Sequence, residues 1–240
     1  MNTIKANLNK TRAIAHRGVS GLETENTLAA FIAAGNRSYF GIETDLHVTI
    51  DGKFVIYHDD TLVRLTGVDK VIEQTTYEEI RALPVKDVHD SGKFRTDLRV
   101  PNLKEYIRIC KKYEKVAVLE LKNAIDPKHI HKIIEEIREE DYLENVIFIS
   151  FFWENLIAVK AICPHQKVQF LTGECDDALI QKLVENQMDL DILYPNLTED
   201  MVKKLKENHV EINVWTCDNK EDAERLANWG VDYVTTNIIE

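Results

Sequence analysis

Apolar residues in the second half of the chain follow two alternating patterns. Short apolar runs typical of buried strands occupy residues 116–121, 146–150, 168–172, 190–194, 211–216 and 233–236. Segments with helical apolar spacing lie between or before them, at residues 102–113, 127–141, 153–163, 176–187, 198–208 and 219–229. Strands that alternate with helices of this length predict a parallel sheet.

The first sixty residues add two more strands and a hairpin. Residues 12–16 and 40–45 have strand patterns, and residues 26–36 between them have helical apolar spacing. Residues 48–57 predict a hairpin that turns at Asp51-Gly52. These two strands bring the chain to eight strand–helix units, the last without its helix, and eight units predict a TIM (β/α)8 barrel.

Residues 61–100 interrupt the alternation between the second and third barrel strands. The segment is polar and mixed, with one helical patch at residues 77–83 before Pro84. A segment of this length is more often functional than filler, so we expect a small insertion here. No linker rich in glycine, serine or proline divides the chain, and residues 1–240 are expected to form one domain.

Composition narrows the possible partners. The net charge of −11 argues against nucleic acid, because the chain has no broad basic face. No apolar run approaches the roughly 20 residues of a membrane span, and residues 1–12 do not resemble a signal peptide, so we expect no membrane insertion and a cytoplasmic location. The four scattered cysteines predict reduced packing residues. The oligomeric state is not indicated.

Charged residues follow the first three predicted barrel strands, where a TIM barrel carries its active site. Glu43 and Asp45 end the second strand and project to the same side, and Glu120 in the third strand faces the same mouth. Three carboxylates suit a hard cation such as Mg²⁺ or Ca²⁺. Ordinary solvated strand ends are the alternative for the Glu43 and Asp45 pair alone.

Four motifs recur in a characteristic order: Ala15-His16-Arg17-Gly18, Glu25-Asn26-Thr27, Glu43-Thr44-Asp45, and His58-Asp59 after Asp51-Gly52. With these motifs the sequence resembles the glycerophosphodiester phosphodiesterase family, and the match runs almost end to end. Weaker family marks follow at Leu62-Val63-Arg64, Val100-Pro101, Glu120-Leu121-Lys122, Ser150-Phe151, Trp215-Thr216 and Gly230-Val231-Asp232. The resemblance places the insertion over the barrel mouth.

The resemblance implies metal-dependent hydrolysis of a small glycerophosphodiester to glycerol 3-phosphate and an alcohol, with Mg²⁺ or Ca²⁺ as cofactor. His16 and His58 match the family's catalytic positions. Histidine titrates near pH 6.5, so one ring can be the base and the other the acid. Asp59 could orient His58, but neighbouring residues on an extended chain point apart, and we do not expect a direct contact.

Two cations and two polar residues complete the expected site. Arg17 and Lys122 are expected to bind phosphate, although a salt bridge from Arg17 to Glu43 is an alternative role. Glu25 is expected beside the site, where it would order Arg17 or a histidine. Asn26 is expected beside the site and as a helix N-cap.

The remaining candidates have weaker signals. Trp215, with Tyr194, Phe151 and Phe152, would either wall the alcohol side of the substrate or only pack the barrel top. His47 follows Asp45 by two residues and is a further candidate for the metal site, against a structural role. His129 and His131 do not share a helix face and are expected at the surface. Asn237 replaces the aspartate of the family's closing motif, which removes a carboxylate near the last strand.

Two alternative functions use the same residues. One is a lysophospholipase D-like or sphingomyelinase D-like barrel with a more apolar mouth. The other is a catalytically inactive barrel that binds phosphorylated glycerol, against which the intact histidines and carboxylates argue.

Overall fold

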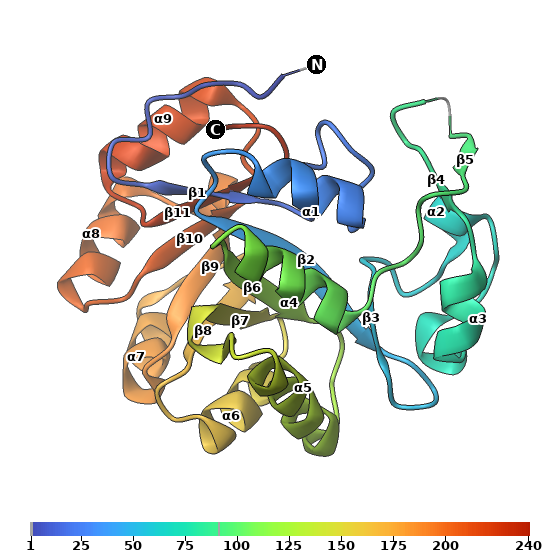
Figure 1. The fold of residues 1–240 in the computed structure, drawn as a ribbon. Helices are drawn as coiled ribbons and strands as arrows, with labels where there is room; N and C mark the ends of the chain where they lie inside the picture. Colours follow the sequence, from blue (N-terminus) through green and yellow to red (C-terminus); the bar gives the residue numbers. More distant parts are fainter. Residues whose placement is uncertain (1, 91) are drawn as a thin grey trace.

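The protein is a closed parallel barrel in the computed structural model, which describes residues 2–90 and 92–240 (Figure 1). Its strands are β1 (Arg12–Ala15), β2 (Gly41–Val48), β6 (Val116–Leu121), β7 (Val146–Ser150), β8 (Lys167–Thr172), β9 (Asp189–Leu193), β10 (Ile212–Trp215) and β11 (Tyr233–Thr236). Strand β1 pairs in parallel with both β11 and β2, and these pairings close the ring. The predicted TIM barrel is confirmed.

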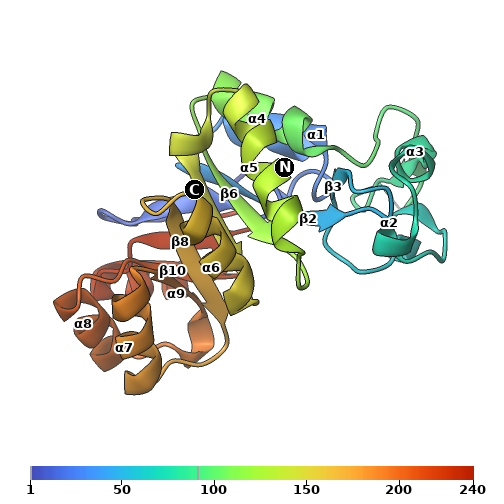
Figure 2. The same ribbon diagram turned by 90° about the horizontal axis from the view of Figure 1, so that it is seen from below.

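Helices surround the barrel in an outer layer (Figures 1 and 2). They are α1 (Leu28–Gly35), α4 (Leu103–Lys112), α5 (Pro127–Glu139), α6 (Trp153–Ile162), α7 (Asp177–Asn186), α8 (Glu199–Glu207) and α9 (Lys220–Trp229). Short 3₁₀ turns precede β7 (η2, Leu143–Asn145) and follow β9 (η3, Tyr194–Asn196). Side-chain caps determine where several helices begin. At α4 the Asn102 side chain accepts from the Glu105 N–H, and the Glu105 side chain accepts from the Asn102 N–H.

The N-cap of α1 differs from the prediction. Thr27, not Asn26, caps this helix, and its hydroxyl accepts from the Ala30 N–H at 3.3 Å. Asn26 has a positive φ of 52° and turns its side chain away from the helix, toward β2. The extended backbone at the residue before the helix, which a side-chain cap requires, belongs to Thr27.

Two apolar cores hold the barrel together. The larger lies between strands and helices, and it includes Cys110, Cys175 and Cys217. The smaller fills the inside of the barrel, and its buried members are Ile14, Val118, Ile147, Ile149, Leu171 and Tyr233. No helix in residues 2–90 and 92–240 has both the length and the apolar character needed to cross a bilayer.

The insertion lies between β2 and β6, as predicted. Before it, β3 (Phe54–Ile56) pairs antiparallel with β2 and forms the predicted hairpin. The insertion then runs through α2 (Val63–Thr66), η1 (Ile72–Gln74), α3 (Tyr77–Ala82) and the hairpin of β4 (Val85–Lys86) and β5 (Phe94–Arg95). A small core of its own, including Tyr57, Leu65 and Ile80, stabilises it. The ribbon views place it to one side of the barrel, beyond β3 (Figures 1 and 2). Its expected position over the mouth stays a prediction.

Candidate active site

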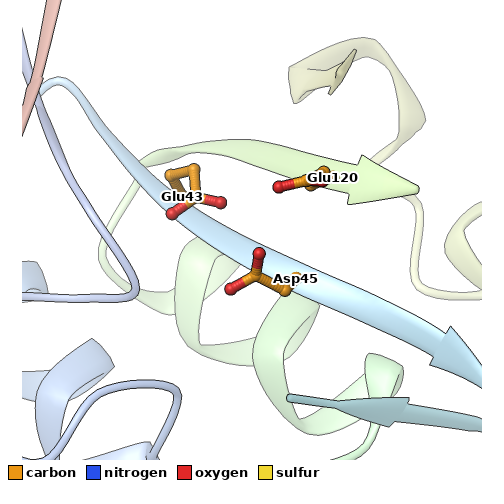
Figure 3. Close-up of side chains that lie close together, drawn as sticks. All are labelled: Glu43, Asp45 and Glu120. Carbon is orange, nitrogen blue, oxygen red and sulfur yellow. The ribbon is translucent and has the colours of Figure 1, made fainter. Parts of the chain in front are cut away.

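Three buried carboxylates meet on β2 and β6, although β2 continues to Val48 and does not end at Glu43 and Asp45 as predicted. Glu43 and Asp45 project from β2 and Glu120 from β6, with their oxygens turned toward one another (Figure 3). One oxygen from each lies within 4.8 Å of the others. The register of the two strands explains this, because Asp45 is paired directly with Glu120 and Glu43 lies two residues earlier on the same side. The structure therefore brings the predicted trio together.

The trio has more negative charge than its surroundings can balance. Burial, and then the charge of Asp45, raises the pKa of Glu43 well above its usual value and that of Glu120 to about 8. Burial also opposes ionisation of Asp45, but the charges of Arg17 and Lys122 hold its pKa below the usual value. Oxygen donors in a dry, repulsive cluster are the ligand set that a hard divalent cation would satisfy. The residues present thus fit a divalent metal ion.

His16 follows β1 with one ring nitrogen fixed. Its Nδ1 lies 2.7 Å from Oδ1 of Asn237, which also accepts from the Ser20 hydroxyl at 2.6 Å. The Asn237 amide nitrogen donates to Asp218 at 2.6 Å, so the oxygen must face the histidine. The His16 Nδ1 therefore carries the proton, and Nε2 is left as an acceptor.

The electrostatic surroundings of His16 keep its ring neutral. Burial, reinforced by the charge of Arg17, lowers the pKa of His16 from 6.5 to about 4. Its Nε2 is 4.0 Å from Oε2 of Glu43, which places the ring beside the carboxylate trio. A neutral imidazole with a free Nε2 is the form that can accept a proton at pH 7.

His58 and Asp59 touch, contrary to the expectation from an extended chain. The His58 Nδ1 is 2.8 Å from Oδ1 of Asp59. The chain bends at residues 58–60 after β3, and this bend lets adjacent side chains turn to the same side. His58 also keeps its backbone in contact with β2, because His47 Nε2 lies 3.4 Å from its carbonyl oxygen.

Arg17 connects several of these groups. Its backbone N–H donates to Glu43 at 2.9 Å, and its guanidinium donates to Glu25 at 2.8 Å and lies 3.5 Å from Asp45. The guanidinium thus pairs with Glu25 rather than with Glu43. Arg17 has a positive φ of 55°, which is uncommon for a residue with a side chain and is typical of strained functional turns. Glu25 thus contacts Arg17, and its role in ordering the guanidinium stays a prediction.

Arg64 is a site residue that sequence reasoning missed. It donates to Asp59 through Nε at 2.7 Å and to Glu25 at 2.8 Å, so it links the insertion to the barrel. The family mark Leu62-Val63-Arg64 was the signal that could have found it.

Lys122 and Asn26 flank Asp45. The Lys122 ammonium lies 3.0 Å from Glu120 and 3.6 Å from Asp45. The Asn26 amide donates to Asp45 at 2.7 Å, and its oxygen accepts from the Thr44 hydroxyl. Asn26 therefore contacts a member of the trio through its side chain.

The groups surround two connected hollows. The inner cavity has a volume of about 100 Å³, and its lining includes His16, Glu43, His58, Asp191 and Trp215. The outer hollow, of about 340 Å³, shares His58, Glu120, Lys122 and Phe151 with the inner one. Both predicted histidines thus border the same cavity as Glu43 and Glu120.

The predicted aromatic residues differ in whether they line the two hollows. Phe151 and Trp215 stack edge to face at 5.6 Å in the inner cavity, and Phe152 lines the outer hollow. Tyr194 lines neither and bonds to Asp222.

The other candidate histidines are not members of the trio. His47 is fully buried, outside the trio, with Nδ1 3.6 Å from Glu73 of the insertion. On α5, His131 is exposed, and His129 is half-buried edge-on to Phe54.

Comparison with known proteins shows the family. Residues 16–240 match the model of the "Glycerophosphoryl diester phosphodiesterase family". A glycerophosphodiester phosphodiesterase from Caldanaerobacter subterraneus subsp. tengcongensis is 34% identical, over 95% of this chain and 94% of that protein. A solved Oleispira antarctica phosphodiesterase, in complex with the product sn-glycerol-3-phosphate, superposes with a TM-score of 0.86 at 26% identity, over 98% of this chain and 96% of that one.

Fold and site thus define a TIM-barrel hydrolase with an acidic centre. The chain belongs to the glycerophosphoryl diester phosphodiesterase family, whose members are phosphoric diester hydrolases.

Proposed function

We propose that this protein hydrolyses small glycerophosphodiesters to glycerol 3-phosphate and an alcohol, with a divalent metal ion and two histidines as proton carriers. The observation that carries the proposal is one cavity bordered by both histidines and by Glu43 and Glu120. Asp45 completes the carboxylate trio beside it. The names of the relatives and the product in the Oleispira structure support the substrate class.

Glu43, Asp45 and Glu120 would hold the metal ion. A bound divalent ion supplies Lewis-acid chemistry, which lowers the pKa of a hydroxyl group and offsets negative charge on phosphate. Asn26 and Lys122 keep the oxygens of Asp45 and Glu120 in place. The ion would be Mg²⁺ or Ca²⁺, because the donors are all oxygens.

His16 and His58 move the protons. His16, neutral with a free Nε2, removes the proton from the glycerol 2-hydroxyl as that oxygen bonds to phosphorus. The bond from phosphorus to the leaving alcohol breaks, and His58 protonates the departing oxygen. Water then opens the cyclic phosphate with the two roles reversed. Direct attack by water is the one-step alternative and uses the same two groups.

Arg17 and Lys122 balance the charge that develops on phosphate. Arg17 is held by Glu25, and Lys122 lies at the junction of the two hollows. Fixed cations in a cavity shielded from water stabilise the transition state more strongly than they would in solvent.

The outer hollow favours a second candidate substrate. Phe151 and Phe152 border it and are 45% and 38% exposed, which would suit an apolar leaving group. A lysophospholipase D-like activity would use this surface. Parallel assays of glycerophosphocholine and lysophosphatidylcholine separate the two.

A metal-by-substrate activity matrix tests the proposal. Protein stripped with chelator and resupplied with Mg²⁺, Ca²⁺ or neither is assayed on glycerophosphocholine and glycerophosphoethanolamine. We expect turnover only with metal. Full activity in excess chelator contradicts metal dependence, and binding without turnover under every condition supports an inactive barrel.

A further inference from the structure

Asp191 is a buried carboxyl group that the proposed reaction leaves unused. It lies on β9, is 1% exposed, and lines the inner cavity. Its Oδ1 is buried and has no hydrogen-bond partner among residues 2–90 and 92–240. Buried polar atoms are nearly always paired, because losing water without a replacement costs free energy. A group of this kind beside a cavity indicates a ligand that completes it.

The polar neighbours of Asp191 bond to one another, and Asn213 also lies beside the Asp191 carboxyl group. Asn213 on β10 donates to Gln169 on β8 at 3.2 Å and accepts from Thr235 on β11 at 3.0 Å. The Trp215 indole donates to the backbone carbonyl of Asp191, not to its carboxyl group. Apolar side chains, among them Ile149 and Leu171, form the packed core inside the barrel. Packing alone would be served by an aliphatic side chain at this position.

The size of the two hollows suggests which end of the substrate lies near Asp191. The inner cavity is the smaller of the two, at about 100 Å³ against about 340 Å³, which favours the compact three-carbon glycerol over a larger alcohol. The outer hollow is wider and shares His58 and Lys122 with the inner one. Phosphate therefore fits the junction, glycerol the inner cavity, and the variable alcohol the outer hollow.

We propose that the Asp191 carboxyl group accepts a hydrogen bond from the terminal hydroxyl of the glycerol moiety and so selects glycerol esters. This inference rests on the proposed function. The 2-hydroxyl, one carbon from the phosphate-bearing carbon, is assigned to the trio and His16. The terminal hydroxyl is the remaining donor on the glycerol, and Asp191 is the cavity's remaining buried carboxyl group.

A pair of substrates tests the contact. Glycerophosphocholine is compared with its analogue lacking the terminal hydroxyl, the phosphocholine ester of propane-1,2-diol, which keeps the 2-hydroxyl. We expect wild type to prefer the glycerol ester roughly 10- to 100-fold in kcat/KM, the cost of leaving a buried polar group without its hydrogen-bond partner. Asp191→Leu should abolish this preference by lowering kcat/KM for the glycerol ester alone.

Two variants serve as matched controls. Asp191→Asn keeps an acceptor oxygen and should retain most of the preference. Asp189→Asn changes a carboxyl group at the start of the same strand that accepts from the Glu211 N–H, and it should leave the preference unchanged. If Asp191→Leu does not fold, Asp191→Ala removes the acceptor without crowding the cavity.

The possible results distinguish failure of the Asp191 contact from failure of the proposed function. A wild type that cleaves both esters equally, or an Asp191→Leu or Asp191→Ala variant that keeps the preference, overturns the contact while the proposed function stands. A wild type that cleaves neither ester with any metal overturns the proposed function and this inference with it. The preference is a ratio within one preparation, so a partly unfolded fraction cancels.

Discussion

The ring of His58 is hydrogen-bonded to the carboxylate of its sequence neighbour, with 2.8 Å between Nδ1 and Asp59 Oδ1. Arg64 binds the other Asp59 oxygen at 2.7 Å and also binds Glu25. The carboxylate therefore holds the proton on Nδ1 and fixes the orientation of the His58 ring, while Arg64 keeps the carboxylate in place. The proposed proton transfer from His58 to the leaving alcohol requires a ring held in one orientation.

Asp59→Ala should lower kcat on glycerophosphocholine by roughly 10- to 100-fold, because His58 loses the partner that orients it. The measurement is steady-state kinetics at saturating metal. Asp60→Ala is the matched control, since the neighbouring carboxylate contacts Asn123 and not the histidine. An Asp59→Ala enzyme within twofold of wild type would show that the contact has no role in turnover.

The two histidines should be distinguishable by their leaving-group dependence. His16→Ala and His58→Ala are each expected to cost roughly 10²- to 10⁴-fold on glycerophosphocholine. A p-nitrophenyl glycerophosphodiester releases a phenolate that needs no proton, so it should rescue the variant that lacks the acid. We expect rescue of His58→Ala and not of His16→Ala. Rescue of His16→Ala alone would reverse the assignment.

The barrel was predictable because its signal is local and repeated. Each buried strand is a short apolar run, and the bounds of β6, β7 and β11 agree with the sequence prediction residue for residue. The placement of Glu43, Asp45 and Glu120 followed from two-residue alternation on neighbouring strands. On a strand, the spacing of residues in the sequence directly predicts which side chains share a side.

What the sequence did not reveal depends on turns and long-range pairs. The contact between His58 and Asp59 requires a bend, which alternation cannot predict. Asn26 points to Asp45 rather than capping its helix because its backbone is left-handed. Asn237 was treated as a lost carboxylate, whereas it is the hydrogen-bond partner of His16, 221 residues away in the chain. Only the closed ring of strands brings those two together.

The metal-free protein should lose stability as the pH rises from about 7 to 9. The pKa of Glu120 is raised to about 8 in the folded state, so folding favours its protonated form. That stabilisation is fully present below the pKa that Glu120 has in the unfolded chain. It is lost as the pH rises through the pKa that Glu120 has in the folded protein. For this group alone we expect about 1 kcal/mol, or roughly 2–4 °C in melting temperature.

Differential scanning fluorimetry with and without Mg²⁺ or Ca²⁺ measures this effect. The ion should restore the melting temperature at high pH, because it replaces the proton as the balancing charge. Glu120→Gln is the control, and it should show a smaller pH dependence and a smaller response to metal. A wild type whose melting temperature ignores both pH and metal would contradict a cation site at this cluster.

Exchanging the amide of Asn237 with the carboxylate of Asp218 behind it should shift the pH dependence of kcat/KM. In Asn237→Asp combined with Asp218→Asn, the carboxylate lies on the side of the histidine and the amide behind it, so the hydrogen bonds are kept. The negative charge then favours the imidazolium and raises the pKa of His16 from about 4 by roughly 1–3 units.

His16 acts as a base only when neutral, so activity is lost as the pH falls through this pKa. The acidic limb of kcat/KM at saturating metal should therefore shift to higher pH, while Asp218→Asn alone should move it far less. An acidic limb that stays in place in the double variant would mean that His16 is not the base.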